Sequence, residues 1–325
     1  MNHINLKYIA MNKIKWIYII VMLLAMIVFN CKSDKKDNQS FDYEEIVEEK
    51  PTYIEIITKS MEFQMPDTIS SGWNTFKYIN KANETHFFRF LKLPDSISIE
   101  NYKKEVDPVF EEGMDLINLG KAQEGFGAFA KLPEWFSKTV PYGGSGLIAP
   151  KHETIVSLKL DSGNYIVECY VKMPNGKFHS TMGMIKAVYV KEDKNDVEPP
   201  KETLTLNITD KGIIVMDSIT KGEHIMKVAV KNQKLHENYA LSDVHLVRLS
   251  PESNLDSLGQ WMVWYNPKGF ITPVPNGITF LGGFNDATEG SIGYFIAELT
   301  PGNYAFISEV PNAMEKGMLK TFTVE

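Results

Sequence analysis

The sequence has only two cysteines, Cys31 and Cys169, among 325 residues, and no stretch that concentrates lysine and arginine. Its net charge of −7 does not favour nucleic acid, whose phosphates require clustered positive charge. It also lacks a G-x-S-x-G elbow, a P-loop and an H-E-x-x-H helix. Because these catalytic signatures are missing and no other catalytic motif stands out, we expect a protein that is not an enzyme.

Residues 16–29 form an apolar run that Lys13 and Lys15 precede and a charged stretch follows. The run is shorter than the about 20 residues that span a bilayer, so it is typical of a signal peptide, with an uncleaved anchor helix as the alternative. Cys31, two residues after the run, resembles the lipobox cysteine of bacterial lipoproteins. That resemblance implies removal of residues 1–30, lipidation of Cys31 and attachment to a membrane. We therefore expect a lipid-anchored protein of the cell envelope, in the outer membrane or at the surface of a Gram-negative bacterium.

Residues 31–50 are highly charged and contain few apolar groups, which predicts a solvated tether between the anchor and the folded part. If Cys31 carries lipid, Cys169 is the only remaining thiol, and no disulfide within the chain is possible. A lone thiol in an oxidising compartment is either buried or held as a metal thiolate.

Two halves of the sequence repeat one pattern, which predicts two copies of one domain. The boundary falls at residues 191–202, a charged segment with a proline pair, and gives domains at 51–190 and 203–325. Three blocks match in the same order: 66–72 with 216–222, 143–165 with 282–304, and 183–190 with 317–324.

Short segments with period-two alternation, rich in β-branched and aromatic residues, fill both copies. We therefore predict an all-β protein of two tandem Greek-key β-sandwiches. The first copy also contains a helical pattern that opens with Asp107-Pro108 as its N-cap region and ends near Gly120. The second copy has a shorter excursion at the corresponding point, which opens with Ser250-Pro251.

The organisation resembles the cupredoxin fold of plastocyanin and its relatives. In that family, one histidine ligand follows a strand that ends in asparagine, as His86 follows Asn80 here, and a loop late in the domain supplies Cys, His and Met. The resemblance implies that His86 and His179 are imidazole ligands, Cys169 the thiolate and Met184 a weak axial ligand. These ligand types favour copper. A different metal site that uses His86, His179 or His152 is an alternative.

A turn at Asn175-Gly176 argues against such a site. If these two residues form a two-residue hairpin turn, as the dipeptide favours, Lys172 faces His179, and His179 points away from the face of Cys169. Only a bulge between the strands would bring the thiol and the imidazole together.

The second copy supplies a comparison, because Ser308 stands where the first copy has Cys169, yet the Gly-Met pair recurs at Met318. We therefore interpret Met184 as a packing residue, and we expect no cofactor, with copper as the alternative. The favoured function is a binding or scaffolding module for an unknown envelope protein or ligand. The alternative function is a type 1 copper electron-transfer protein that uses only the first domain.

One aromatic cluster is a candidate ligand-binding surface. Its side chains suit stacking on a sugar or a peptide, but aromatic residues at this density more commonly cover the open end of a sandwich core, which we favour. The cluster consists of Trp261, Trp264, Tyr265 and Phe270.

Overall fold

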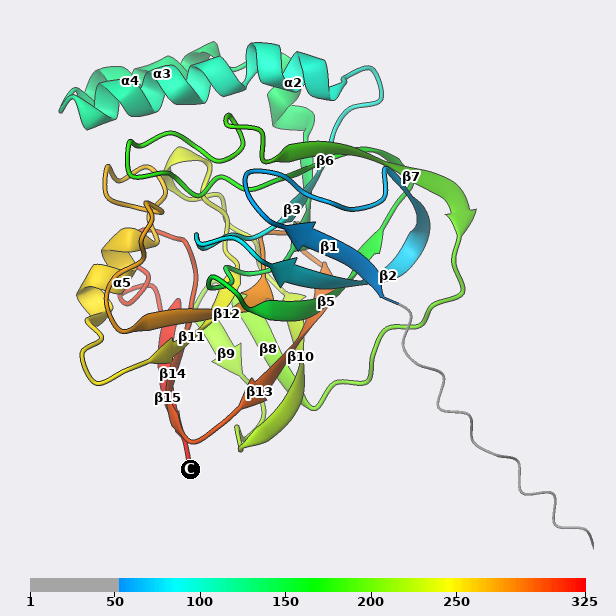
Figure 1. Ribbon diagram of the computed structural model, residues 1–325, viewed down its shortest axis with the longest axis vertical. Coiled ribbons are helices and arrows are strands. Elements are labelled where there is room, and N and C mark those ends of the chain that lie inside the picture. The colour runs from blue at the N-terminus through cyan, green and yellow to red at the C-terminus, as the bar shows by residue number, and fades with distance from the viewer. Residues whose placement is uncertain (1–52) are drawn as a thin grey trace, which may run out of the picture. The chain divides into compact units, whose positions relative to one another are not determined.

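The computed structural model describes residues 53–325, which form two β-sandwiches with a helical layer on one side (Figure 1). The predicted signal peptide, the lipidation site and the tether lie outside these residues. Among the helices of the described part, none has the length and hydrophobicity to cross a membrane.

The first half is a sandwich of two sheets, β1-β2-β5 and β4-β3-β6-β7. Alternation dictates its core: in β2, Phe76 and Tyr78 are fully buried, whereas Lys77 between them is partly exposed. The two sheets are joined where β2 also pairs in parallel with β7. The strands are β1 (Ile54–Thr58), β2 (Thr68–Asn80), β3 (Arg89–Lys92), β4 (Val140–Gly144), β5 (Glu153–Leu160), β6 (Gly163–Glu168) and β7 (Ile185–Lys194).

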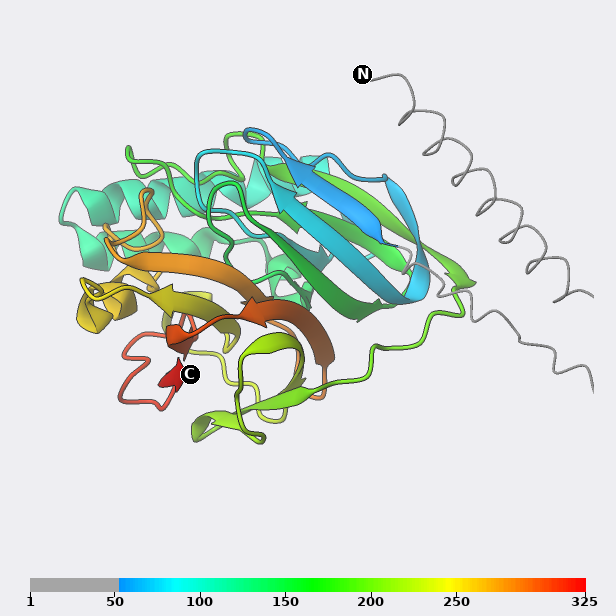
Figure 2. The same ribbon diagram turned by 60° about the horizontal axis from the view of Figure 1, so that its bottom comes forward.

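The second half repeats this arrangement, with sheets β9-β8-β10-β13 and β12-β11-β14-β15. Strands β5 and β13 pair across the two halves and join them in one continuous sheet (Figure 2). The strands are β8 (Leu204–Thr209), β9 (Gly212–Val215), β10 (Gly222–Val230), β11 (Val244–Leu249), β12 (Ile278–Phe284), β13 (Ile292–Leu299), β14 (Gly302–Ile307) and β15 (Leu319–Val324).

The strand registers match between the halves and confirm the predicted tandem sandwich. Gly72 pairs with Leu160 in the first half, and Gly222 pairs with Leu299 in the second, as the aligned blocks require. Residues 51–325 pack as one unit. The limits of the two domains, at 51–190 and 203–325, therefore stay a prediction from the sequence.

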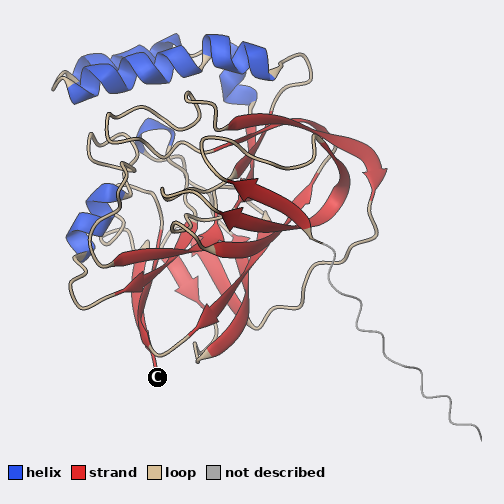
Figure 3. Ribbon diagram, in the orientation of Figure 1, coloured by secondary structure: helices blue, strands red, loops and turns tan. Residues whose placement is uncertain are grey.

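A helical insertion between β3 and β4 covers the outer face of the first sandwich (Figure 3). Its buried residues Tyr102 and Val106 pack on Ile166, which points outward from β6. The sequence predicts the N-cap at Asp107, whereas the structure has Val106 as the N-cap and Asp107 as the first helical residue. The insertion contains α2 (Ile99–Glu105), α3 (Asp107–Asn118), α4 (Ala122–Ala128), η1 (Phe129–Lys131) and η2 (Glu134–Lys138).

The second half has a smaller excursion between β11 and β12, with the short helix α5 (Leu255–Trp261). The single turn η3 (Glu237–Tyr239) lies between β10 and β11. The N-cap of α5 is Asn254, whose side chain accepts a hydrogen bond from the Ser257 N–H. The expected excursion after Ser250-Pro251 is thus present.

Candidate metal centre

The hairpin after β6 has a different register from the one that the sequence predicts. Lys172 pairs with Phe178, and the Met173 N–H donates to the Lys177 carbonyl, so three residues, 174–176, form the loop. The two-residue turn at Asn175-Gly176 is therefore wrong. Gly176 has a φ of +83°, which suits the left-handed position of a three-residue hairpin loop.

This shift by one residue decides which face His179 occupies. The His179 N–H donates to the carbonyl of Val171, so His179 lies opposite Val171 rather than opposite Lys172. Val171 shares its face with Cys169, because side chains alternate along the strand. A slip of one residue moves every side chain of a strand to the other face, so His179 now points to the same side as Cys169.

Contacts with the second half hold this register. The Lys172 N–H donates to the Phe270 carbonyl at 2.7 Å, and the Thr272 N–H donates to the Lys172 carbonyl at 2.9 Å. The Lys172 ammonium is buried and donates to the carbonyls of Trp264 and Asn266. Burial lowers the pKa of Lys172 to about 7. The hairpin is thus fixed by residues about 100 positions further along the chain, outside the reach of its local sequence.

His86, Cys169 and His179 converge in the interior of the first sandwich, and all three are fully buried. The Cys169 Sγ lies 3.8 Å from the Nδ1 atom of each histidine, and the two Nδ1 atoms are 3.1 Å apart. For metal bonds of about 2.0 Å to nitrogen and about 2.3 Å to sulfur, this triangle corresponds to angles of about 100° between the nitrogens and about 120° to the sulfur. These separations would allow one ion to be held by all three atoms, which make up the His₂Cys ligand set known from blue copper sites.

The protonation of the three side chains suits metal binding. Burial and the neighbouring His179 lower the pKa of His86 to about 3, and burial lowers the pKa of His179 to about 4. Both imidazoles are therefore neutral at pH 7 and have a lone pair for a metal. Burial raises the pKa of Cys169 to about 12, although the N–H groups of Phe87 and Val171 lower it in part. The thiol is thus protonated until a cation displaces its proton.

The rings of His86 and His179 are neither hydrogen-bonded to backbone groups nor exposed to solvent. The Nε2 atoms of His86 and His179 are buried without a hydrogen-bond partner, and the Nδ1 atoms face only each other and the sulfur. His86 is positioned by two backbone hydrogen bonds with Ile148, and the Asn80 amide donates to the Ile148 carbonyl. His152 is exposed, and its Nδ1 contacts the Pro150 carbonyl, so it lies outside this cluster.

The backbone of Met184 forms hydrogen bonds with the backbone of Cys169 and of His179. The Cys169 N–H donates to the Met184 carbonyl at 3.2 Å, and the Met184 N–H donates to the His179 carbonyl at 2.9 Å. Its side chain is fully buried and belongs to the hydrophobic core. An axial contact of its sulfur with a metal stays a prediction.

The second half has the same frame without the ligands. The Ser308 N–H donates to the Met318 carbonyl, and the Met318 N–H donates to the Ala313 carbonyl, which makes these residues equivalent to Cys169, Met184 and His179. Lys92 pairs with Tyr165, and Arg248 pairs with the aligned Tyr304, so Arg248 is the counterpart of Lys92. Six residues before each of them stand His86 and Ser242, which makes Ser242 the counterpart of His86. Serine and alanine therefore replace the thiolate and both imidazoles.

A second cluster, Asp243, His245 and Glu309, lies in the second half. The Nδ1 of His245 accepts from the Leu147 N–H, so its Nε2 carries the proton, and it donates this proton to Asp243 at 2.5 Å. Both ring nitrogens are thus engaged, and the imidazole has no lone pair for a metal. Asp243 also accepts from the Ser308 hydroxyl and the Glu309 N–H, which indicates a structural network.

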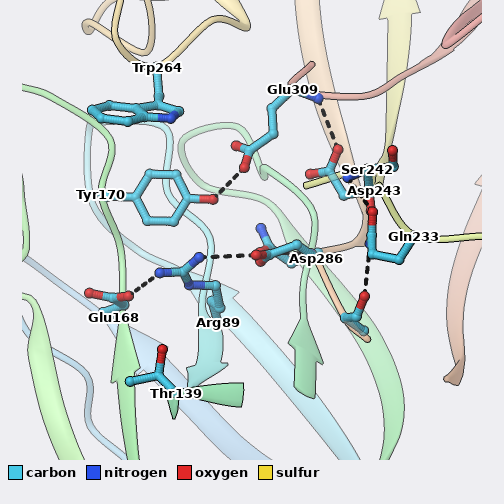
Figure 4. A network of polar contacts seen from close by, with 12 residues as sticks. Arg89, Thr139, Glu168, Tyr170, Gln233, Ser242, Asp243, Trp264, Asp286 and Glu309 are labelled. Carbon is cyan, nitrogen blue, oxygen red and sulfur yellow. Dashed lines mark hydrogen bonds and ion pairs between the residues drawn. The ribbon is translucent and has the colours of Figure 1, made fainter. Parts of the chain in front are cut away.

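A buried polar network that the sequence did not reveal involves the two neighbours of Cys169 in the ligand strand, the segment Glu168–Tyr170 (Figure 4). Arg89 pairs with Glu168, the residue before Cys169, and with Asp286 of the second half at 3.1 Å. Tyr170, the residue after Cys169, donates its hydroxyl to Glu309 at 2.7 Å. No sequence pattern joins these residues, because they come from four segments of the chain.

The predicted aromatic cluster lies mainly in the interior. Trp261, Trp264 and Phe270 are buried, and Tyr265 is partly exposed. Phe270 stacks on Tyr170, and the Trp261 indole donates to the Ile271 carbonyl. Trp264 is the member that lines a cavity, described below.

Comparisons with known proteins concern the fold. No described protein family and no curated protein match the sequence. Among solved structures, auracyanin A, a "blue" copper protein from the green thermophilic photosynthetic bacterium Chloroflexus aurantiacus, aligns with 44% of this chain and 100% of its own at 19% identity, with a TM-score of 0.27. A multicopper oxidase aligns with 84% of this chain and 88% of its own at 12% identity, with a TM-score of 0.22. The copper nitrite reductase of Nitrosomonas europaea covers 84% and 94% at 11% identity, with a TM-score of 0.23.

The fold is cupredoxin-like. The repeated strand order and the paired sheets of each half carry this statement, and identities and TM-scores this low add nothing about activity. The expectation of a protein that is not an enzyme is corrected here: it rested on missing motifs alone, and two of the structures that align with 84% of this chain are named as enzymes, a multicopper oxidase and a copper nitrite reductase. The absence of hydrolase and nucleotide-binding motifs says nothing about redox chemistry, because the ligands of a redox metal can lie far apart in the sequence.

Proposed function

We propose that the first sandwich holds a type 1 copper ion on His86, Cys169 and His179, and that the chain passes electrons one at a time through this centre. The observation that carries the proposal is the triangle of three buried donor atoms with separations of 3.8, 3.8 and 3.1 Å. A copper ion there would supply one-electron redox chemistry, for which a His₂Cys set with a weak axial ligand is typical.

The residues of the chain make the site rigid before any ion enters. His86 is fixed by its backbone pairing with Ile148, and His179 by the hairpin that Lys172 attaches to the second half. Such preorganisation keeps the donors close in spite of the cost of burying them without partners. The second sandwich, which has Ser308 in place of Cys169, holds no second ion on this proposal. Its role is to position the ligand loop, residues 169–184, through backbone hydrogen bonds with Lys172.

The test is to add Cu(II) to the reduced, purified chain and to record the visible spectrum together with the copper content. We expect one copper per chain and the intense band of a copper thiolate bond. Cys169→Ser and His86→Ala should abolish the band, while His152→Ala, which removes an exposed histidine, should leave it unchanged. The Ser308 precedent predicts that Cys169→Ser still folds. A folded chain that binds no stoichiometric copper, or that keeps the band in Cys169→Ser, would overturn the proposal.

We also propose that the centre is displayed at the cell envelope through a lipid on Cys31. Support comes from the sequence alone: two lysines, an apolar run and a cysteine in the order of a lipoprotein signal, followed by a charged tether. The partner that would exchange electrons with the centre belongs, on this proposal, to the same compartment.

A further inference from the structure

A cavity of about 490 Å³ lies behind the ligand strand, between the helical insertion and the second sandwich. Its volume falls in the range of pockets for small organic molecules, about 300–1,000 Å³. Two of its lining residues, Leu235 and Tyr239, are exposed, which places one end of the cavity at the protein surface. Its walls come from the helical insertion, the ligand strand and the second half, and include Phe110, Phe129, Glu168, Tyr170, Trp264 and Glu309.

The ionisable side chains of this lining are mostly acidic. Five carboxyl groups face the cavity, from Asp107, Glu134, Glu168, Asp286 and Glu309, whereas Arg89 contributes the single cation. The Arg89 guanidinium forms ion pairs with Glu168 and Asp286. No lysine or histidine lines the cavity. The remaining carboxyl groups have no basic residue within the lining to balance them.

Two carboxyl oxygens in this lining have no hydrogen-bond partner. They are the Oδ1 atom of Asp286 and the Oε2 atom of Glu309, and each residue is only 2% exposed. Buried polar atoms in proteins almost always have a partner, so these two neighbouring carboxyl oxygens are free to accept hydrogen bonds from a molecule in the cavity. Burial and the charges of Asp243 and Asp286 raise the pKa of Glu309 well above its usual range, which a bound cation would reverse.

Aromatic rings complete the site. The Arg89 guanidinium lies 4.7 Å from the centroid of the Tyr170 ring, which shows that this wall already accommodates a cation. Trp264 lines the same cavity as Tyr170 and Glu309 (Figure 4) and offers the ring type that binds cations best. A bare metal ion would leave most of the cavity unfilled and would not use its aromatic walls.

We propose that this cavity binds a small organic cation of the arylalkylamine type, with its ammonium between Asp286 and Glu309 and its ring against Trp264. Glu168 and Tyr170 flank Cys169 in the chain, so the occupant lies directly behind the strand that carries the predicted thiolate. Binding itself needs no metal, and the site goes beyond the proposed copper centre. Failure of one therefore does not entail failure of the other.

The experiment is calorimetric titration of the metal-free chain with three matched compounds. 2-Phenylethylamine carries a cation, 2-phenylethanol is its neutral counterpart, and 3-phenylpropanoate is an anion of similar size. We expect the amine to bind with a submillimolar dissociation constant, the alcohol at least tenfold more weakly, and the acid not at all. Equal affinities for the amine and the alcohol would overturn the proposal, because the carboxyl groups would then play no part.

Variants locate the binding site. Glu309→Gln should weaken the amine at least tenfold and leave the alcohol unchanged, and its amide oxygen can still accept the Tyr170 hydroxyl, which protects the fold. Asp286→Asn should act similarly, with a thermal melt to show that the loss of its ion pair has not unfolded the chain. Glu298→Gln, on the exposed face of β13, is the control and should have no effect. Unchanged amine affinity in a folded Glu309→Gln variant would overturn the proposal, as would tight Mn²⁺ binding that excludes the amine.

Discussion

Metal binding to His86, Cys169 and His179 should release one proton per ion, and this number follows from the structure. Because the pKa values of the two histidines are lowered to about 3 and about 4, both rings are already deprotonated at pH 5.5. The thiol, whose pKa is raised to about 12, still carries its proton at pH 7.5. A metal takes the thiolate and the neutral imidazoles, so only the thiol proton is displaced.

The affinity should therefore rise about tenfold per pH unit between about pH 5.5 and pH 9. A pH of 7.5 is about 4.5 pH units below the pKa of the thiol, so removal of its proton costs about 6 kcal/mol of the binding free energy. Zn²⁺ is the suitable ion for this measurement, because it binds Cys and His without redox chemistry. Titration in several buffers with different heats of ionisation gives the number of protons directly.

The alternative outcomes are well separated. Histidines with ordinary pKa values would raise the release to almost three protons at pH 5.5, and a thiolate formed before metal binding would reduce it to none at pH 7.5. Either number would refute the reasoning about burial. His152→Ala should behave as the wild type, whereas Cys169→Ser should bind weakly and release no proton.

Three other perturbations have defined outcomes. Arg89→Met leaves Glu168 and Asp286 buried without a cation, so the free energy of unfolding in urea should fall by about 3–5 kcal/mol at pH 8, and a loss below about 1 kcal/mol would contradict this. Burial and Glu168 raise the pKa of Asp107 to about 7, so the folded state holds a proton that the unfolded state releases, and stability should fall as the pH rises from about 4 to about 7. Asp107→Asn should remove that decline and stabilise the protein by about 1–2 kcal/mol at pH 8 but not at about pH 4; equal stabilisation at the two pH values would count against it. Cys31→Ala should lose incorporation of a fatty-acid analogue, and equal labelling of both chains would exclude lipidation there.

The fold was predictable because its determinants are local and occur twice. Alternation in segments such as β2 fixes which side chains enter the core. Each of the seven strands of the first half has a counterpart in the second half, which has β9 in addition. The helical insertion was visible from Asp107-Pro108, since proline in the first turn and a change from period two to period three or four indicate a helix.

The polar network was not predictable, because it depends on contacts between distant segments. Arg89 and Glu168 are cross-strand neighbours in a sheet, and Asp286 comes from the second half, which the pairing of β5 with β13 joins to the first. Each residue alone is an ordinary charged side chain near a strand end. Their burial, and the two unpaired oxygens that mark the cavity, follow from the packing of the halves.

The ligand loop lies between these extremes, because the sequence contained a signal for it that the turn dipeptide obscured. His179 precedes Met184 by five residues, and Ala313 precedes Met318 by the same number. The extra residues of the first copy therefore lie between Cys169 and the histidine, so His179 keeps the place that Ala313 has in the shorter loop.

Alignment to the shorter loop thus predicts convergence of the thiol and the imidazole, whereas the preference of Asn175-Gly176 for a two-residue turn predicts divergence. The two hairpin registers differ by one residue, and the local free-energy difference between turn types is small. The backbone hydrogen bonds of Lys172 with Phe270 and Thr272 decide between them in the folded chain. Tertiary contacts thus override the local turn preference and determine on which face of the strand the predicted ligand lies.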